Sequence, residues 1–164
     1  MEKTHDELTR VNKGIISIEV HTFIYRRTIY MRKQILIVDD DEDDCELFID
    51  AARLVDADLV FEKIHTSQEA IRLLKSSYRP DFIFLDLNMP MIDGNTCLKE
   101  IRRLDSLANV PVIIYSTSKR KNDESRLRTM GADYFLTKPS SLRELCDEIS
   151  HILSTEWRVP TENV

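Results

Sequence analysis

The chain has 164 residues, enough for one domain with a proper core and too few for two full-sized ones. Its 42% hydrophobic and 32% charged content is that of an ordinary globular protein, and a net charge of −6 disfavours a nucleic-acid-binding surface, which needs clustered lysine and arginine. No apolar stretch approaches the roughly 18 residues of a membrane span, and the N-terminus lacks the features of a signal peptide, so we expect a cytoplasmic protein.

The start of the chain differs from the rest. Residues 1–13 are polar, and apolar and polar residues alternate from Ile16 to Ile24, which suits a half-buried strand. Two interpretations stay open for residues 1–30: a small N-terminal appendage, or an upstream extension outside the biological product, with Met31 as the true start. We expect poor order there in either case, a folded domain over residues 31–157 and a C-terminal tail over 158–164.

From residue 34 onward, apolar runs and amphipathic stretches alternate. The predicted strands cover residues 35–38, 59–64, 82–86, 112–116 and 132–136. The predicted helices cover residues 43–55, 66–74, 95–104, 120–130 and 141–153. The inward stripe of the first helix is predicted to contain Leu47, Phe48, Ala51, Leu54 and Val55. This regular alternation favours an α/β fold with a doubly wound, five-stranded parallel sheet and helices on both faces.

Two helices carry a recognisable start signal. Thr66 and Glu69 form one capping box, and Ser141 and Glu144 form another. The three cysteines (Cys45, Cys97, Cys146) lie far apart and lack the CxxC or CxH spacing of a zinc site. We therefore predict reduced thiols that mostly pack in the interior.

Polar residues lie at the carboxyl ends of four predicted strands: Asp39 with Asp40, then Asp86, Ser116 and Lys138. Parallel strands all end at one edge of their sheet, so we expect these side chains to converge. Three adjacent carboxylates repel one another and raise at least one pKa unless a cation lies among them. Oxygen-only ligands suit Mg²⁺, while Lys138 and Ser116 can bind an anion. This combination is what phosphoryl transfer to a carboxylate requires.

Over about residues 33–155 the chain resembles a receiver domain of the response regulators of two-component signalling. The matching motifs are Val38-Asp39-Asp40, Leu85-Asp86-Leu87-Asn88-Met89-Pro90 with Asp93-Gly94, Ser116, and Lys138-Pro139. One such motif is weak by itself, but all four in this order and spacing are highly specific. The resemblance implies a flavodoxin-like fold with the strand order 2-1-3-4-5.

The resemblance also implies how the carboxylates would work. Asp86 would be the phosphoacceptor, taking its phosphoryl group from a phosphohistidine on a sensor histidine kinase. Asp40 would bind Mg²⁺ directly, Asp39 would assist largely through water, and Asn88 would contribute its backbone carbonyl. Asp86 would itself be a metal ligand.

Further roles follow from the same resemblance. Ser116 and Lys138 would hold phosphoryl oxygens, and Ser116 would move towards the phosphoryl group on activation. Ser116 departs from the more frequent threonine but keeps the hydroxyl group. Phe135 would be the switch aromatic, although simple core packing also explains it, and Tyr134 would point to the opposite face of its strand. Asn88 and Ser118 would tune the lifetime of the phosphoryl group.

The acidic run from Asp39 to Asp44 has two interpretations. Beyond Asp40 we interpret it as solvated, with Asp43 and Asp44 only favouring the first turn of a helix. A calcium loop is disfavoured because the run lacks the required glycine and terminal glutamate spacing.

Three functions stay open. A signalling module with few residues after its last helix would act by partner binding through residues 120–153, as a monomer or weak dimer, or would relay phosphate to a histidine phosphotransfer protein. A Mg²⁺-dependent phosphatase or phosphotransferase usually has a second aspartate two residues after its nucleophile, and Asn88 cannot act as a general acid there. A pseudo-receiver that only binds partners is disfavoured by the intact acidic set.

Overall fold

The computed structural model describes residues 32–90, 93–117 and 121–157. The predictions made for residues 1–30, for Ser118 and for the tail at 158–164 lie outside these ranges.

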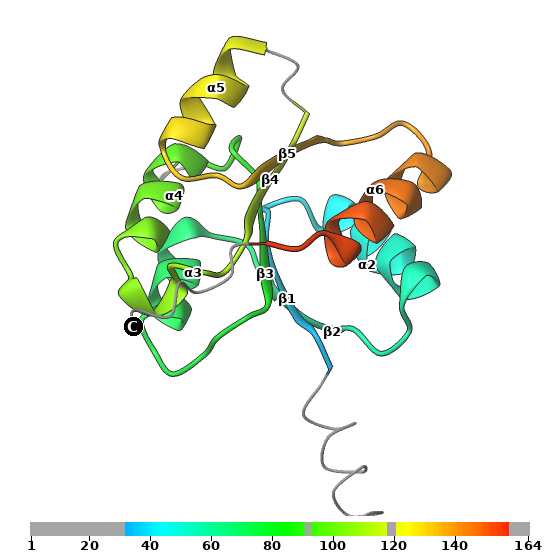
Figure 1. Ribbon diagram of the computed structural model, residues 1–164, viewed down its shortest axis with the longest axis horizontal. Helices are drawn as coiled ribbons and strands as arrows, with labels where there is room; N and C mark the ends of the chain where they lie inside the picture. The colour runs from blue at the N-terminus through cyan, green and yellow to red at the C-terminus, as the bar shows by residue number, and fades with distance from the viewer. Residues whose placement is uncertain (1–31, 91–92, 118–120, 158–164) are drawn as a thin grey trace, which may run out of the picture. The chain divides into compact units, whose positions relative to one another are not determined.

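Within the described residues, five parallel strands form one sheet in the order β2-β1-β3-β4-β5 (Figure 1), so the predicted fold class and strand order are confirmed. The strands are β1 Gln34–Val38, β2 Val60–Ile64, β3 Phe82–Leu85, β4 Val112–Ser116 and β5 Tyr134–Thr137. Strands β3 and β4 are buried along their whole length, and β1 along all but its first residue. Continuous apolar runs suit these positions because helices cover both faces of the sheet.

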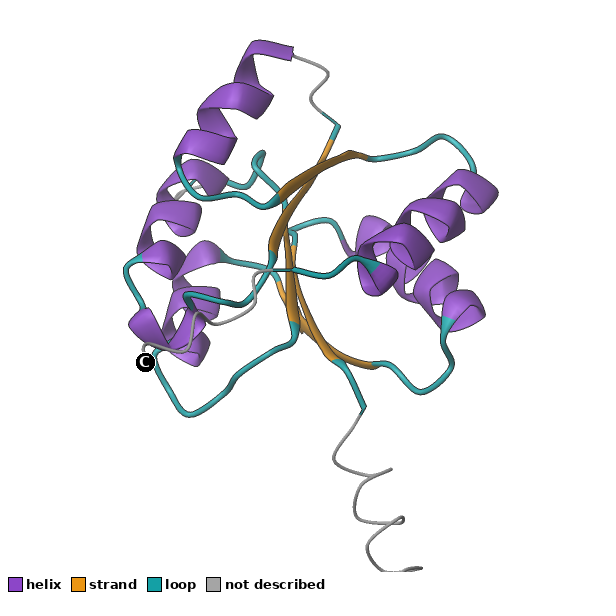
Figure 2. Cartoon of the chain, in the orientation of Figure 1, coloured by secondary structure: helices purple, strands orange, loops and turns teal. Residues whose placement is uncertain are grey.

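The helices lie on both faces of the sheet (Figure 2). They are α2 Glu42–Val55, α3 Ser67–Leu74, α4 Gly94–Arg102, α5 Lys121–Thr129 and α6 Leu142–Ser154, with a short 3₁₀ helix, η1, at Asp105–Leu107. Helices α2 and α6 cover one face, and α3, α4 and α5 cover the other (Figure 1). In the part of the chain that the structure describes, no helix is long and apolar enough to span a membrane.

Each face of the sheet has its own apolar core, because successive side chains of a strand point to opposite faces. Ile35 and Ile37 of β1 belong to the core beneath α2 and α6. Leu36 and Val38 belong to the core beneath the other three helices. The sheet is thus fixed in register from both sides, which holds its carboxyl edge in place.

Side-chain caps begin the helices that leave this edge of the sheet. Asp41 caps α2 and Asp93 caps α4. Both predicted capping boxes are confirmed at their first residue: Thr66 accepts a hydrogen bond from the N–H of Glu69, and Ser141 accepts one from the N–H of Glu144. These caps satisfy backbone groups that a helix start leaves without intrahelical partners.

The predicted inward stripe of the first helix is partly wrong. Leu47 and Leu54 are 44% and 70% exposed. Phe48 and Ala51 are buried as predicted, and Cys45, Ile49 and Ala52 complete the buried face of α2. The helix carries apolar residues on more than one side, and only the side that meets α6 and the sheet is covered, so periodicity alone did not identify the right stripe.

The prediction of reduced cysteines that mostly pack in the interior agrees with the structure. All three cysteines are free, with Cys45 and Cys97 buried and Cys146 half-buried. Burial raises the pKa of Cys45 to about 12 and that of Cys97 to about 11. Both are therefore inert packing groups at neutral pH.

Arg102, at the end of α4, ties the loops around β4 and β5 together. Its guanidinium donates hydrogen bonds to the carbonyl oxygens of Gly131, Leu107 and Val110, and pairs with Asp133. Asp133 also accepts a hydrogen bond from the N–H that begins β4. The two charged side chains are only 13% and 6% exposed, so their pairing offsets part of the cost of burying both charges.

We expect Arg102→Ala to lower the free energy of unfolding by about 3–5 kcal/mol, because it removes the positive charge paired with the mostly buried Asp133 carboxylate and three hydrogen bonds to backbone carbonyls. Urea unfolding measures this loss. The matched control is Arg103→Ala, whose side chain is 73% exposed and pairs with Glu100, for a loss of about 1 kcal/mol or less. Equal losses in the two variants would contradict the role of Arg102.

Candidate functional site

The polar residues at the strand ends gather at the carboxyl edge of the sheet. Asp39 and Asp40 follow β1, and Asp86 follows the central strand β3. One carboxylate oxygen from each of the three lies within 4.8 Å of the others. The expectation that the topology brings these carboxylates together is confirmed.

The donor set fits a hard divalent cation. Asp39 and Asp86 are buried, Asp40 is exposed, and all three offer carboxylate oxygens. A cation of this kind prefers oxygen ligands and keeps several waters, which an exposed third ligand allows. The same three charges, held this close, need positive charge nearby.

Lys138 supplies positive charge from the protein itself. Its Nζ lies 2.7 Å from Asp39 Oδ2, 2.6 Å from Asp44 Oδ2 and 3.9 Å from Asp86 Oδ2. Burial alone would lower the pKa of Lys138, but the hydrogen bonds to Asp39 and Asp44 outweigh it, so the pKa is raised. Lys138 is therefore a permanent cation between α2 and the sheet edge, and its ammonium also lies 5.2 Å from the Tyr115 ring centroid.

Burial, hydrogen bonds and neighbouring charges act on the pKa of Asp39 in opposite directions, and the net shift is upward. Burial is the largest of them and raises its pKa. The hydrogen bonds from Lys138 and from the N–H of Asp41 lower it, and the charge of Asp86 contributes a smaller rise. A raised pKa was expected here, but desolvation matters more than the repulsion between carboxylates that motivated the expectation.

Backbone contacts hold Asp86 in position. Its N–H donates to the carbonyl of Val38 over 2.9 Å, and its Oδ1 accepts the N–H of Leu87 over 2.7 Å. The start of α4 presses on the same segment: a Cβ added to Gly94 would lie 2.2 Å from the carbonyl oxygen of Asp86. Only glycine permits this approach, so the Asp93-Gly94 pair has a steric reason beyond turn formation.

Ser116 is linked to the acidic cluster through its hydrogen bonds with Lys138 and Asn88. It is fully buried at the end of β4, and its carbonyl accepts the N–H of Lys138 over 2.9 Å. The side-chain amide of Asn88 donates to Ser116 Oγ over 3.1 Å and to Thr117 Oγ1 over 3.3 Å. The sequence predicted a backbone role for Asn88 and gave no sign of this side-chain contact, which depends on the register between two non-consecutive loops.

Asp44 is the residue whose role the sequence prediction missed. The expectation of a solvated first-turn carboxylate is wrong for Asp44, because it forms an ion pair with the buried Lys138. The sequence held no signal for this contact, because Asp44 differs from its acidic neighbours only through the position of Lys138, which the fold determines. The rest of the run agrees with the prediction, since Asp41 is the exposed N-cap and Asp43 is exposed.

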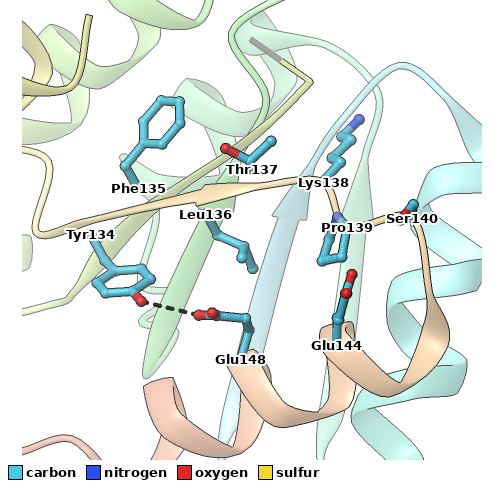
Figure 3. A pocket seen from close by; sticks show the side chains of 9 residues that line it. All are labelled: Tyr134, Phe135, Leu136, Thr137, Lys138, Pro139, Ser140, Glu144 and Glu148. Carbon is cyan, nitrogen blue, oxygen red and sulfur yellow. Dashed lines mark hydrogen bonds between the residues drawn. The ribbon is translucent and has the colours of Figure 1, made fainter. Parts of the chain in front are cut away.

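The two aromatic residues of β5 point to opposite sides of the strand (Figure 3). Phe135 is half-buried and packs against the core beneath α3, α4 and α5. Tyr134 packs against the other core, and its hydroxyl donates to Glu148 of α6 over 3.0 Å. The predicted alternation is confirmed.

Comparison with known proteins agrees with this geometry. Residues 35–150 match the model of the response regulator receiver domain family. The polar-differentiation response regulator DivK of Brucella anthropi is 33% identical over 125 residues, which cover 75% of this chain and 98% of that protein.

Solved structures of response regulators are also similar. The phosphorylated cyanobacterial phytochrome response regulator RcpA superposes with a TM-score of 0.69 at 27% identity, covering 78% of this chain and 99% of that one. The Mn²⁺-bound response regulator Rcp1 superposes with a TM-score of 0.67 at 26% identity, covering 77% and 99% of the two chains. Receiver domains are phosphoacceptor signalling modules, and each implies a cognate histidine kinase. The chain therefore belongs to the response regulator receiver domain family.

Proposed function

We propose that Asp86 accepts a phosphoryl group from the phosphohistidine of a sensor kinase. The observation that carries this proposal is the position of its buried carboxylate, within 4.8 Å of the Asp39 and Asp40 oxygens and 3.9 Å from Lys138 Nζ. An oxygen of Asp86 forms a bond to phosphorus while the phosphorus–nitrogen bond breaks, and the leaving imidazole takes up a proton. Leu87, through its N–H on Oδ1, orients the carboxylate for this attack.

The remaining site residues stabilise the charge that arrives. Asp39, Asp40, Asp86 and the backbone carbonyl of Asn88 would hold Mg²⁺, whose charge offsets that of the carboxylates and the phosphoryl group. The Lys138 ammonium contributes a second positive charge at phosphoryl oxygens.

Ser116 and Phe135 would change conformation when Asp86 is phosphorylated. The Ser116 hydroxyl donates to a phosphoryl oxygen, and Phe135 repacks on the α3–α5 side of β5 when the serine moves. The half-buried position of Phe135 supports this role, since a fully packed ring has less room to change rotamer.

The test is incubation of the whole chain with acetyl phosphate and Mg²⁺, followed by intact mass. We expect a gain of one phosphoryl group per chain in a linkage that alkali hydrolyses, as an acyl phosphate does. Profiling against purified histidine kinases then identifies the cognate donor. Absence of any gain in a folded protein that binds Mg²⁺ would contradict the proposal and favour a pseudo-receiver.

Removal of the metal is expected to stop phosphoryl uptake and to lower stability. At a hundredfold excess over its dissociation constant, Mg²⁺ should raise the free energy of unfolding by about 2.7 kcal/mol, because it binds only the folded chain. Urea unfolding with Mg²⁺ and with EDTA measures the difference. Asp40→Asn, which removes the exposed carboxylate of the cluster, should lose most of this effect. A metal effect of the same size in that variant would exclude Asp40 as a ligand.

Output is proposed to pass through residues 120–153 to a partner or a histidine phosphotransfer protein. Along the described part of this face lies a pocket of about 500 Å³ between β5 and α6. Glu144 and Glu148 project from α6 towards β5 into it (Figure 3), so it suits a basic side chain of the partner. In this scheme the protein works in the cytoplasm, where the kinase phosphohistidine is presented, as a monomer or weak dimer.

An arginine-rich peptide serves as a probe of this pocket. We expect the double substitution of Glu144 and Glu148 by glutamine to weaken its binding roughly two- to fivefold, as loss of an exposed ion pair does. Amide chemical-shift titration gives the affinity. Asp147→Asn, an exposed acid of the same helix that does not line the pocket, is the matched control. Equal weakening by the control would indicate general charge attraction and no pocket.

A further inference from the structure

The ammonium of Lys138 pairs with two carboxylates, one inside the acidic cluster at the strand ends and one outside it. Asp39 belongs to the Asp39–Asp40–Asp86 cluster at the strand ends, whereas Asp44 belongs to the first turn of α2 and lies outside that cluster. The two Nζ–Oδ2 distances are nearly equal, 2.7 Å to Asp39 and 2.6 Å to Asp44. The distance to Asp86 Oδ2 is longer, at 3.9 Å. Lys138 is thus at ion-pair distance from the proposed phosphoacceptor but beyond hydrogen-bond distance.

Backbone hydrogen bonds fix the positions of both Asp44 and Lys138, the partners of the ion pair outside the cluster. The N–H of Asp44 donates to the side chain of the N-cap Asp41 over 3.2 Å, which fixes the first turn of α2. The N–H of Lys138 donates to the carbonyl of Ser116, which fixes the lysine backbone beside β4. The Asp44–Lys138 pair therefore joins α2 to the end of β5 across the site.

We propose that Asp44 is a positioning residue that competes with the phosphoryl group on Asp86 for Lys138. This inference rests on the proposed function of Asp86. An ammonium has three N–H donors, and Asp39 and Asp44 engage two of them at hydrogen-bond distance. A phosphoryl group brings nearly two negative charges to a point close to Asp86, which draws the ammonium across the remaining gap.

The solvent exposure of the two carboxylates determines which of them loses its contact with Lys138. The Asp39 side chain is 2% exposed, so a charge left there without Lys138 is costly. The Asp44 side chain is 34% exposed, so water solvates it once the contact breaks. Phosphorylation therefore breaks the Asp44 contact first, and the energy of that contact opposes phosphorylation. The same step releases the first turn of α2 from β5.

The experiment measures the affinity for beryllofluoride, a phosphoryl analogue, in saturating Mg²⁺ by calorimetry. Asp44→Asn is expected to bind it about tenfold more tightly than the unchanged chain, a typical coupling for groups that share one partner. Asp43→Asn is the matched control, since it removes an exposed charge from the same helical turn without touching Lys138, and should change the affinity little. Unchanged or weaker binding by Asp44→Asn, or an equal gain by Asp43→Asn, overturns the inference.

A double-mutant cycle separates competition from a general charge effect. In a Lys138→Met background, Asp44→Asn should no longer alter the affinity, because the shared partner is gone. A full gain in that background overturns the proposal. A crystal structure of the unchanged chain with beryllofluoride tests the same point without any variant that could fail to fold. Lys138 should then contact fluoride and lie beyond ion-pair distance of Asp44, and a retained 2.6 Å contact would overturn the proposal.

These outcomes separate this inference from the function on which it rests. If the unchanged chain gains no phosphoryl group and binds no beryllofluoride, both the function and the competition are wrong. If the unchanged chain binds the analogue and Asp44→Asn behaves like Asp43→Asn, only the competition is wrong.

Discussion

Replacing Asp86 with asparagine is expected to abolish phosphoryl uptake while the fold is retained. The amide is a poor nucleophile, yet it has nearly the size of the carboxylate and can still accept the N–H of Leu87. Because the change also removes one buried negative charge from beside Asp39, we expect stability to be unchanged or raised. Intact mass after acetyl phosphate treatment measures uptake, and urea unfolding measures stability.

The matched control for this variant is Asp41→Asn. Asp41 is an exposed acid of the same run, and asparagine caps helices as well as aspartate does. The control should take up a phosphoryl group like the unchanged chain. Uptake by Asp86→Asn at the unchanged level would move the phosphoacceptor to another residue.

Lys138→Met is expected to have two large effects. Without its ammonium the buried Asp39 loses its counter-charge, and the free energy of unfolding should fall by about 3–5 kcal/mol in the absence of metal. Mg²⁺ should restore more stability to this variant than to the unchanged chain, because the cation replaces the missing charge. The rate of phosphoryl uptake should fall on the order of 10²-fold, as for the loss of one charge-stabilising donor.

Lys63→Met provides the comparison for Lys138→Met. Lys63 also bridges two carboxylates, Glu42 and Glu46, but its side chain is 29% exposed and theirs more than half. Its removal should lower the free energy of unfolding far less than removal of Lys138, and it should leave phosphoryl uptake unchanged. Similar stability losses for Lys63 and Lys138 would show that burial does not decide the strength of these bridges.

The sequence was sufficient for the fold because local and global signals agree. The run Phe82 to Leu85 is apolar throughout, as a strand covered on both faces must be, and it lies at the centre of the sheet. Placing Asp86, Asp39 and Asp40 together then required only that parallel strands end at one edge.

What the sequence could not predict depends on which side of an element is covered. Leu47 and Leu54 are apolar and helical, yet exposed, since the packing partner of α2 is α6 and the sheet. Asp44 looked like its acidic neighbours until the position of Lys138 was known. Arg102 gave no signal at all, because its partners come from two separate connections, one before β4 and one before β5.

Asn88 bears on the alternative of a phosphatase with an aspartyl nucleophile. That class needs a general acid near the nucleophile, and the Asn88 amide instead donates to Ser116 and Thr117. An amide cannot supply a proton to a leaving group. Membership of the receiver family agrees with this and makes the chain a phosphoacceptor signalling protein.

The most direct measurement is chemical localisation of the phosphoryl group. Borohydride reduces an acyl phosphate to an alcohol and so converts a phosphorylated aspartate to homoserine, which peptide mass spectrometry locates. After treatment with acetyl phosphate and Mg²⁺, we expect homoserine at position 86 and none at positions 39 and 40. Homoserine at either of those two positions, or at none in a protein that has gained a phosphoryl group, would contradict this expectation.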